Sequence, residues 1–367
     1  MSITRKIKGA LAAVLCAGML AGCAAGSGES SSESSSQNVS ENSSDNSAAD
    51  SSGGAASTEA PEAAPTEEPE AASPDVIHVA ALKGPTAMGM IKLMDDNSEN
   101  SGFEFTVAGA ADEITPSIIQ GKTDVACVPA NLASVLYNKT EGGVKVLAVN
   151  TLGVLYIVQN GEPTIAGAAD LAGKTIYASG KGATPEFALR YILTQNGLDP
   201  DNDVSIEWKT EHSECLSALL NDEGSAALLP QPFVTTAQTK NESVSVALDL
   251  NEEWEELNNG SALITGVVIA RSEFAEQYPE AIGSFMEEYK ASVEYVNSDN
   301  AGAAQLIGKY DIVPAAVAEK ALPHCNIVFI SGAEMKEKLS GYLEVLFESD
   351  AASVGGAVPA DDFYYGA

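Results

Sequence analysis

Positive charge is scarce in this sequence of 367 residues. Nineteen lysines and arginines stand against 52 aspartates and glutamates, which gives a formal net charge of −33. A protein that binds nucleic acid or an anionic membrane surface needs a basic patch. The acidic residues are spread along the chain rather than clustered, which is typical of a solubilising surface. The composition therefore argues against nucleic acid and against a polybasic membrane contact as partners.

Cysteine and histidine are equally rare, with five and three copies. Beyond residue 100 the cysteines are Cys127, Cys215 and Cys325, and the histidines of the chain are His78, His212 and His324. None of the spacings is that of a metal site. The sequence predicts no metal and no cofactor, and Cys127, inside an apolar strand, is expected to be a small buried hydrophobe.

The N-terminus has the order of a secretory signal. Arg5, Lys6 and Lys8 precede an apolar run over 10–20 that is too short to span a bilayer. Leu20-Ala21-Gly22-Cys23 then matches the bacterial lipobox. This predicts a signal peptide over 1–22 and a lipid on Cys23, which anchors an extracytoplasmic protein to the bacterial cell membrane. A plain signal peptide with a chance cysteine is the alternative.

Residues 24–74 contain no aromatic residue and no lysine or arginine. Serine, alanine, glutamate, asparagine and proline dominate instead. Such a segment cannot bury enough apolar surface to offset its chain entropy. We expect 23–74 to be a lipidated cysteine followed by a disordered tether.

The stretch 170–193 reads as strand, glycine-containing turn and helix. Gly180 and Gly182 permit positive φ in the turn, Thr184 is a good N-cap, and Pro185 suits the first helical position. Free backbone N–H groups at such a helix start face whatever lies above the strand end. An ordinary turn without a ligand is the alternative.

Apolar strands and amphipathic helices alternate along the rest of the chain, which predicts an α/β fold with helices on both faces of a sheet. One pattern occurs twice. A helix, a polar turn, an apolar strand and a proline run over 118–129 and again over 219–230, with equal spacing. The simplest account is two similar lobes that present equivalent loops to a shared cleft, with chance as the alternative.

Several phrases together resemble the periplasmic-type solute-binding proteins of ABC importers, in the branch for sulfonates, taurine, nitrate and thiamine precursors. Besides the lipobox, they are Gly-Lys-Thr-Asp-Val-Ala at 121–126, Asp-Leu-Ala-Gly-Lys-Thr-Ile at 170–176, Leu-Pro-Gln-Pro-Phe at 229–233 and Val-Ile-Ala-Arg-Ser-Glu-Phe at 268–274. Their order, over about 76–350, carries the resemblance.

The resemblance implies a two-lobed, type II periplasmic-binding-protein-like fold, each lobe a mixed sheet flanked by helices, with two hinge crossings. Lobe one would be 76–157 plus 267–367, and lobe two 158–266. It implies a monomer that captures a small polar or anionic organic solute for a permease and an ATPase. An enzyme on the same fold is the alternative, which the lipobox and the absence of a legible catalytic constellation oppose; a ligand-sensing lipoprotein is another.

The ligand site is expected at strand-end loops. The predicted residues are Gly84, Pro85, Thr86, Ala87, Met88, Asn131 and Leu132 from lobe one, Thr151 at the back, and Ser179, Lys181, Gly182, Ala183, Thr184, Pro185 and Gln231 from lobe two. Donors at 179–185 favour an anionic or strongly polar ligand end. Glu186, in the same helical turn, competes for those donors. Lys181 is either a ligand contact or a solvated surface lysine.

Overall fold

The computed structural model describes residues 73–99 and 102–367. The expected signal peptide, the lipid-carrying Cys23 and nearly all of the expected tether lie outside these residues. Within them, no helix combines the length and the apolar character needed to cross a membrane.

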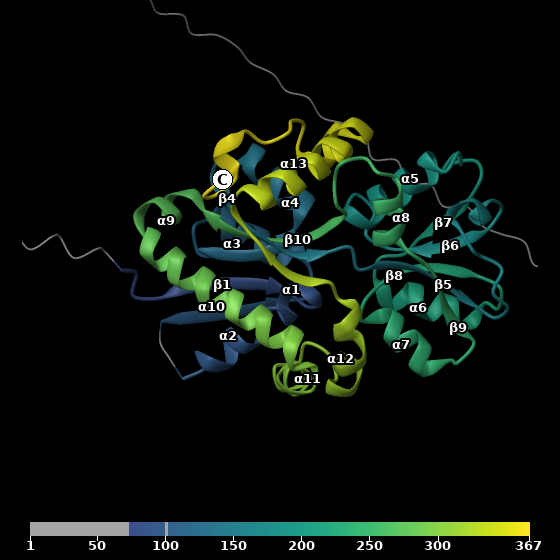
Figure 1. The fold of residues 1–367 in the computed structure, drawn as a ribbon, viewed down its shortest axis with the longest axis horizontal. Helices are drawn as coiled ribbons and strands as arrows, with labels where there is room; N and C mark the ends of the chain where they lie inside the picture. Colours follow the sequence, from purple (N-terminus) through teal and green to yellow (C-terminus); the bar gives the residue numbers. More distant parts are fainter. Residues whose placement is uncertain (1–72, 100–101) are drawn as a thin grey trace, which may run out of the picture. The chain divides into compact units, whose positions relative to one another are not determined.

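The first of two mixed sheets takes its strands from both ends of the described chain (Figure 1). Its order is β11-β4-β10-β3-β1-β2, in which β1 is parallel to β2 and β3, while β10 is antiparallel to β3 and β4. The strands are β1 (Ile77–Leu82), β2 (Phe103–Ala108), β3 (Val125–Pro129), β4 (Val144–Leu152), β10 (Ile264–Arg271) and β11 (Ile327–Ile330). Around it lie α1 (Pro85–Met88), α2 (Ile91–Asp96), α3 (Ala111–Ile119), α4 (Ala130–Lys139), α9 (Ser272–Gln277), α10 (Pro279–Ser298), α11 (Asn300–Lys309), α12 (Ala315–Ala321) and α13 (Gly332–Ser349).

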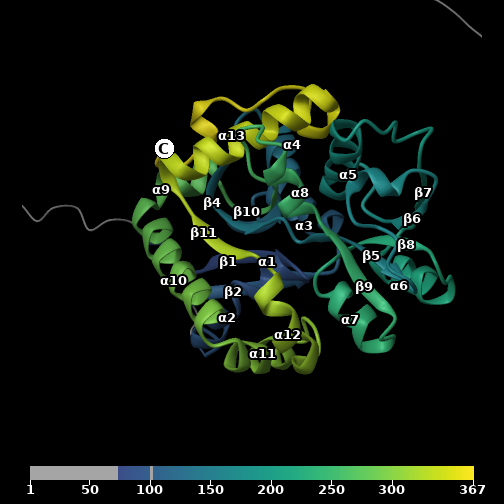
Figure 2. The same cartoon turned by 45° about the vertical axis from the view of Figure 1, so that its right-hand side comes forward.

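The second sheet is built from the middle of the chain, in the order β7-β6-β8-β5-β9. Its strands are β5 (Leu155–Asn160), β6 (Thr175–Ala178), β7 (Ser205–Trp208), β8 (Ala226–Pro230) and β9 (Val244–Asp249). Its helices are α5 (Thr184–Gln195), α6 (His212–Asn221), α7 (Phe233–Lys240) and α8 (Leu250–Glu256). Figure 2 shows α6 and α7 on one side of this sheet and α5 with α8 on the other. The predicted α/β fold of two mixed sheets flanked by helices is confirmed.

Strand alternation explains why helices cover both faces. Along β10, Val267 and Ile269 belong to one apolar cluster, whereas Val268 and Ala270 belong to another. Successive side chains of a strand point to opposite faces, so a strand that is apolar throughout must be covered twice. Cys127 lies on such a strand and is fully buried, as expected, and burial raises the pKa of its thiol to about 12.

The repeated sequence pattern occupies equivalent places in the two sheets. β3 lies between β1 and β10, and β8 lies between β6 and β5. The proline that ends each strand pairs with the antiparallel strand next to it, Pro129 with Gly266 and Pro230 with Leu155. The repeated pattern at 118–129 and 219–230 therefore falls at corresponding positions of the two sheets.

The chain passes between the sheets twice, once after β4 and once before β10. The first crossing is the short link Gly153-Val154. A Cβ on Gly153 would lie 2.7 Å from Cβ of Asn251, a separation that real side chains do not adopt. The crossing is thus packed closely against α8, which leads into the return crossing.

Several local expectations were wrong. The apolar spacing of Ala87, Met90, Ile91 and Met94 fits a single helix, but the structure divides this stretch into α1 and α2. The Ser292 hydroxyl donates to the Gly89 carbonyl and accepts from the Lys92 and Leu93 N–H groups, which starts a new helix. The N-cap of α5 is Ala183 rather than Thr184, because Ala183 has the extended backbone and Thr184 is already helical. The elements α7, α8 and β11 were not expected from the sequence.

Candidate functional site

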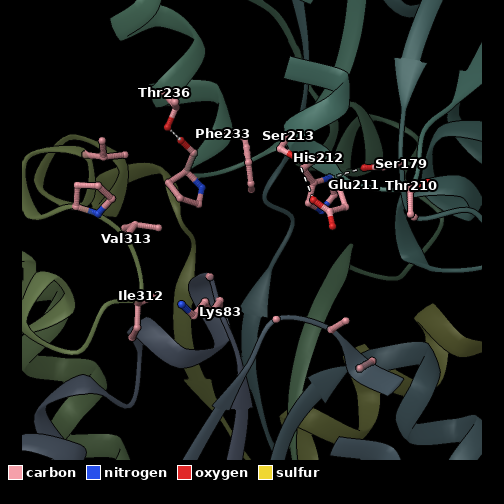
Figure 3. Close-up of a pocket in the computed structure, with 18 of the residues that line it drawn as sticks. Lys83, Ser179, Thr210, Glu211, His212, Ser213, Phe233, Thr236, Ile312 and Val313 are labelled. Carbon is pink, nitrogen blue, oxygen red and sulfur yellow. Dashed lines mark hydrogen bonds between the residues drawn. The ribbon is translucent and has the colours of Figure 1, made fainter. Parts of the chain in front are cut away.

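A cavity of about 690 Å³ lies where loops from the two sheets face each other (Figure 3). From the first sheet it is lined by the residues after β1 (83–84) and β2 (109–113). Residues 312–317, which run from the turn after α11 into the first turn of α12, also line it. From the second sheet it is lined by residues after β6 (179–180), β7 (210–213) and β8 (232–236). Carboxyl ends of parallel strands are the usual ligand position in open α/β sheets.

Ser179 and His212 form a polar pair on the second-sheet wall. Their Oγ and Nδ1 atoms are 2.5 Å apart, and the Phe233 ring packs 5.3 Å from the imidazole, centroid to centroid. Burial lowers the pKa of His212 to about 4. At neutral pH the imidazole is therefore uncharged and offers the cavity a hydrogen-bonding group without a charge.

Charge around the cavity is mostly negative. Glu113 and Glu211 line it, and Lys83 is the one cation among the described lining residues. The Lys83 ammonium donates to the carbonyl of Asp311 at 2.9 Å and lies 3.5 Å from its carboxylate. Figure 3 shows Lys83 across the cavity from Phe233 and His212.

Gly84 and Ser179 are the predicted site residues that line this cavity. Beside Gly84, Pro85 begins α1, the Thr86 hydroxyl donates to the Leu82 carbonyl, and Ala87 and Met88 are fully buried in the core. The Thr151 hydroxyl is also buried and donates to Oδ1 of Asn150 at 3.1 Å. The Gln231 side-chain oxygen accepts from the Thr235 N–H and hydroxyl.

Other predicted residues meet in a buried seam between the sheets. The Thr184 hydroxyl donates to Oδ1 of Asn131 at 3.4 Å, and the Tyr342 hydroxyl lies 3.5 Å from the Thr184 hydroxyl. Asn131 also donates to the Ser353 carbonyl, and Leu132 is partly buried beside the same core. The first turn of α4, which follows β3 directly, thus contacts the first turn of α5 instead of the cavity.

Lys181 and Gly182 line a separate hollow of about 500 Å³ beside the start of α5. There the Gly182 N–H donates to the Glu186 carboxylate at 2.6 Å. Ala183 and Pro185 follow as the N-cap and the second residue of the helix. The competition expected from Glu186 is therefore observed: its carboxylate accepts from the turn that was expected to hold an anion.

Besides Lys83, four parts of the cavity were not predicted: 109–113 after β2, 210–213 after β7, 232–236 after β8, and 312–317. The first three could have been found, because each follows a strand that runs parallel to a neighbour, and the residues after such a strand are candidates by rule. The fourth could not, since only the packing of α11 and α12 brings it there.

Comparison with known proteins decides the family. The model for the phosphonate periplasmic substrate-binding protein of ABC transporters matches residues 90–318. The chain belongs to this family. Membership implies a small-molecule ligand, permease and ATPase partners, an extracytoplasmic location and a non-enzymatic role for this substrate-binding protein. No curated protein matches the sequence significantly.

Solved structures support the same fold. An ABC transporter structure from Parabacteroides distasonis superposes with a TM-score of 0.67 at 24% identity, over 79% of this chain and 99% of that one. The periplasmic aliphatic sulphonate binding protein SsuA from Escherichia coli gives 0.63 at 18% identity, over 76% and 88%. SsuA from Xanthomonas axonopodis pv. citri, bound to MOPS, gives 0.60 at 16% identity, over 79% and 96%. At these identities the likeness establishes the fold alone.

Proposed function

We propose that this substrate-binding protein captures a small polar organic solute in the cavity between its two sheets and delivers it, as a lipid-anchored monomer, to an ABC permease. The lobes would be 76–157 plus 267–367 and 158–266, although the second sheet already begins at Leu155 of β5 and the chain returns to the first at Ile264 of β10. One observation carries the proposal: strand-end loops of both sheets line the same cavity.

The two chain crossings supply the motion that this function needs. A solute held by both halves stabilises the closed arrangement, because each half contributes contacts that the other cannot replace. Gly84 and Ser179 would contact the solute from opposite sides. Asn131 and Thr184 would hold the buried edge of the closed arrangement, where they already meet.

We expect Phe233→Ala to weaken binding of the retained solute about tenfold, because the ring forms an apolar wall of the cavity and aromatic contacts contribute about 0.5–1.5 kcal/mol beyond the area they bury. Native mass spectrometry of the full chain identifies the solute, and calorimetry compares the variants. Phe347→Ala is the matched control, since Phe347 lies on α13 outside the cavity. A chain that retains no solute, from expression or from a cell extract, would contradict the proposed function.

We further propose that Cys23 is the first residue of the mature protein and carries the lipid. The order of basic residues, apolar run and Leu-Ala-Gly-Cys supports this. Cells labelled with a fatty-acid probe should yield a labelled wild-type chain and an unlabelled Cys23→Ala chain. Cys16→Ala, inside the signal, is the control and should be labelled normally. Equal labelling of Cys23→Ala and wild type would exclude the anchor.

A further inference from the structure

We infer that the cavity selects a neutral or cationic organic solute, with N–H donors on an apolar body, and rejects phosphonates and sulfonates. The inference rests on the proposed function, since it assumes that a solute binds there. It departs from the anionic ligand that the sequence suggested.

The first support is the balance of charge. An anion in the cavity would meet the carboxylates of Glu113 and Glu211, with only Lys83 of the described lining to oppose them. Lys83 already donates to Asp311, whose carboxylate lies 3.5 Å away. Glu113 and Glu211 are both exposed at the cavity wall, so they repel an incoming anion in a way that added salt screens. A solute that donates N–H bonds finds acceptors in the same carboxylates.

The second support is that backbone N–H groups at the N-termini of these helices already donate to glutamate side chains of the same helices. Three helices each carry a glutamate that folds back on its own N-terminal turn. Glu113 accepts from Ala110 N–H at 2.8 Å before α3, and Glu214 accepts from Thr210 N–H at 2.8 Å before α6; both starts line the cavity. Glu186 accepts from Gly182 N–H at 2.6 Å before α5, beside the separate hollow. Donors and positive helix ends of this kind bind phosphate in other proteins. Here each faces a carboxylate of its own chain.

The third support is the remaining lining, which is apolar or uncharged. Phe233, Ile312 and Val313 supply an apolar wall (Figure 3). His212 is half-buried and neutral beside Ser179, so it adds no positive charge. A bare oxyanion would leave the wall without a partner, whereas an organic body would cover it.

The test compares matched probes on the full chain by calorimetry. Propyl and benzyl groups each carry, in turn, an amine, an alcohol, a sulfonate and a phosphonate. In the propyl series, the benzyl series or both, we expect the amine or the alcohol to bind at least tenfold more tightly than the sulfonate and the phosphonate that carry the same organic group. The double variant Glu113→Gln/Glu211→Gln should reduce that preference about tenfold or more, because charge-assisted hydrogen bonds are lost. Glutamine at position 113 retains an acceptor for the helix cap.

Glu280→Gln is the control, because Glu280 is also a first-turn glutamate but lies on α10 outside the cavity. It should bind the probes as wild type does. Tighter binding of a phosphonate or sulfonate would overturn the inference and leave the proposed function intact. An unchanged preference in the double variant, or no binding in either series at millimolar concentration, would also overturn it. The proposed function is tested separately, by native mass spectrometry of the solute that the chain retains.

Discussion

Replacing Trp254 with alanine should lower the free energy of unfolding by about 3–5 kcal/mol, as for other fully buried large aromatic residues. Trp254 is completely buried where α8 meets α5 and α13. Its ring lies 4.8 Å from that of Tyr191 and 5.6 Å from that of Tyr342, and its indole N–H donates to the Ser261 hydroxyl at 3.0 Å. Truncation would remove these contacts and leave a cavity lined by aromatic rings.

Urea unfolding followed by circular dichroism measures the loss. Trp208→Ala is the matched control, since Trp208 is only partly buried on the edge strand β7. We expect its loss to be roughly half as large, because less apolar area leaves water there. Equal losses in the two variants would show that the Tyr191–Trp254–Tyr342 cluster does not hold the helices together as argued.

Most strands were predictable because their apolar character depends little on distant contacts. A strand that is covered by helices on both faces buries every side chain, so its residues form a continuous apolar run. Such a run can be recognised from the local sequence alone. The helix α7 shows the limit. Its sequence, Phe-Val-Thr-Thr-Ala-Gln-Thr-Lys, contains three threonines and a valine, which are weak helix formers. Burial of Val234 and Ala237 against the second sheet outweighs that preference.

The α8 helix carried a signal that was overlooked. Asp249 accepts from the Asn251 N–H in the structure, which is the role of an N-cap aspartate, and two glutamates follow in the first turn. The strand β11 is different: it is short, lies at the edge of its sheet, and pairs irregularly with β4. Its sequence, Ile-Val-Phe-Ile between Asn326 and Ser331, nevertheless consists of strand formers, so this signal too was overlooked.

The candidate site was predictable only as a rule about strand ends. The rule led to Gly84 and Ser179, which line the cavity. It did not reveal which loops would meet one another, because that depends on how the two halves are docked. Asn131 and Thr184 follow the rule equally well, yet they are buried against each other.

Acidification should destabilise the protein through His212. The imidazole has a pKa of about 4 in the folded chain, because it is buried, and an ordinary pKa of 6.5 when unfolded. Above pH 6.5 it is neutral in both states. As pH falls from 6.5 to 4, the unfolded chain takes up a proton that the folded chain refuses, so stability falls. At about 1.4 kcal/mol per pH unit, the total is about 3 kcal/mol.

The measurement compares wild type with His212→Gln by urea unfolding at pH 7 and pH 4. Glutamine cannot take up the proton, while the titrating carboxylates are common to both chains and cancel in the difference. Wild type should therefore lose about 3 kcal/mol more than the variant on acidification. Ser179→Ala keeps the imidazole and removes its hydroxyl partner, so it should lose as much as wild type if burial is the cause. A wild-type loss no larger than that of His212→Gln would mean that the imidazole is solvated at the cavity wall, and that a solute would meet a chargeable group there rather than a neutral one.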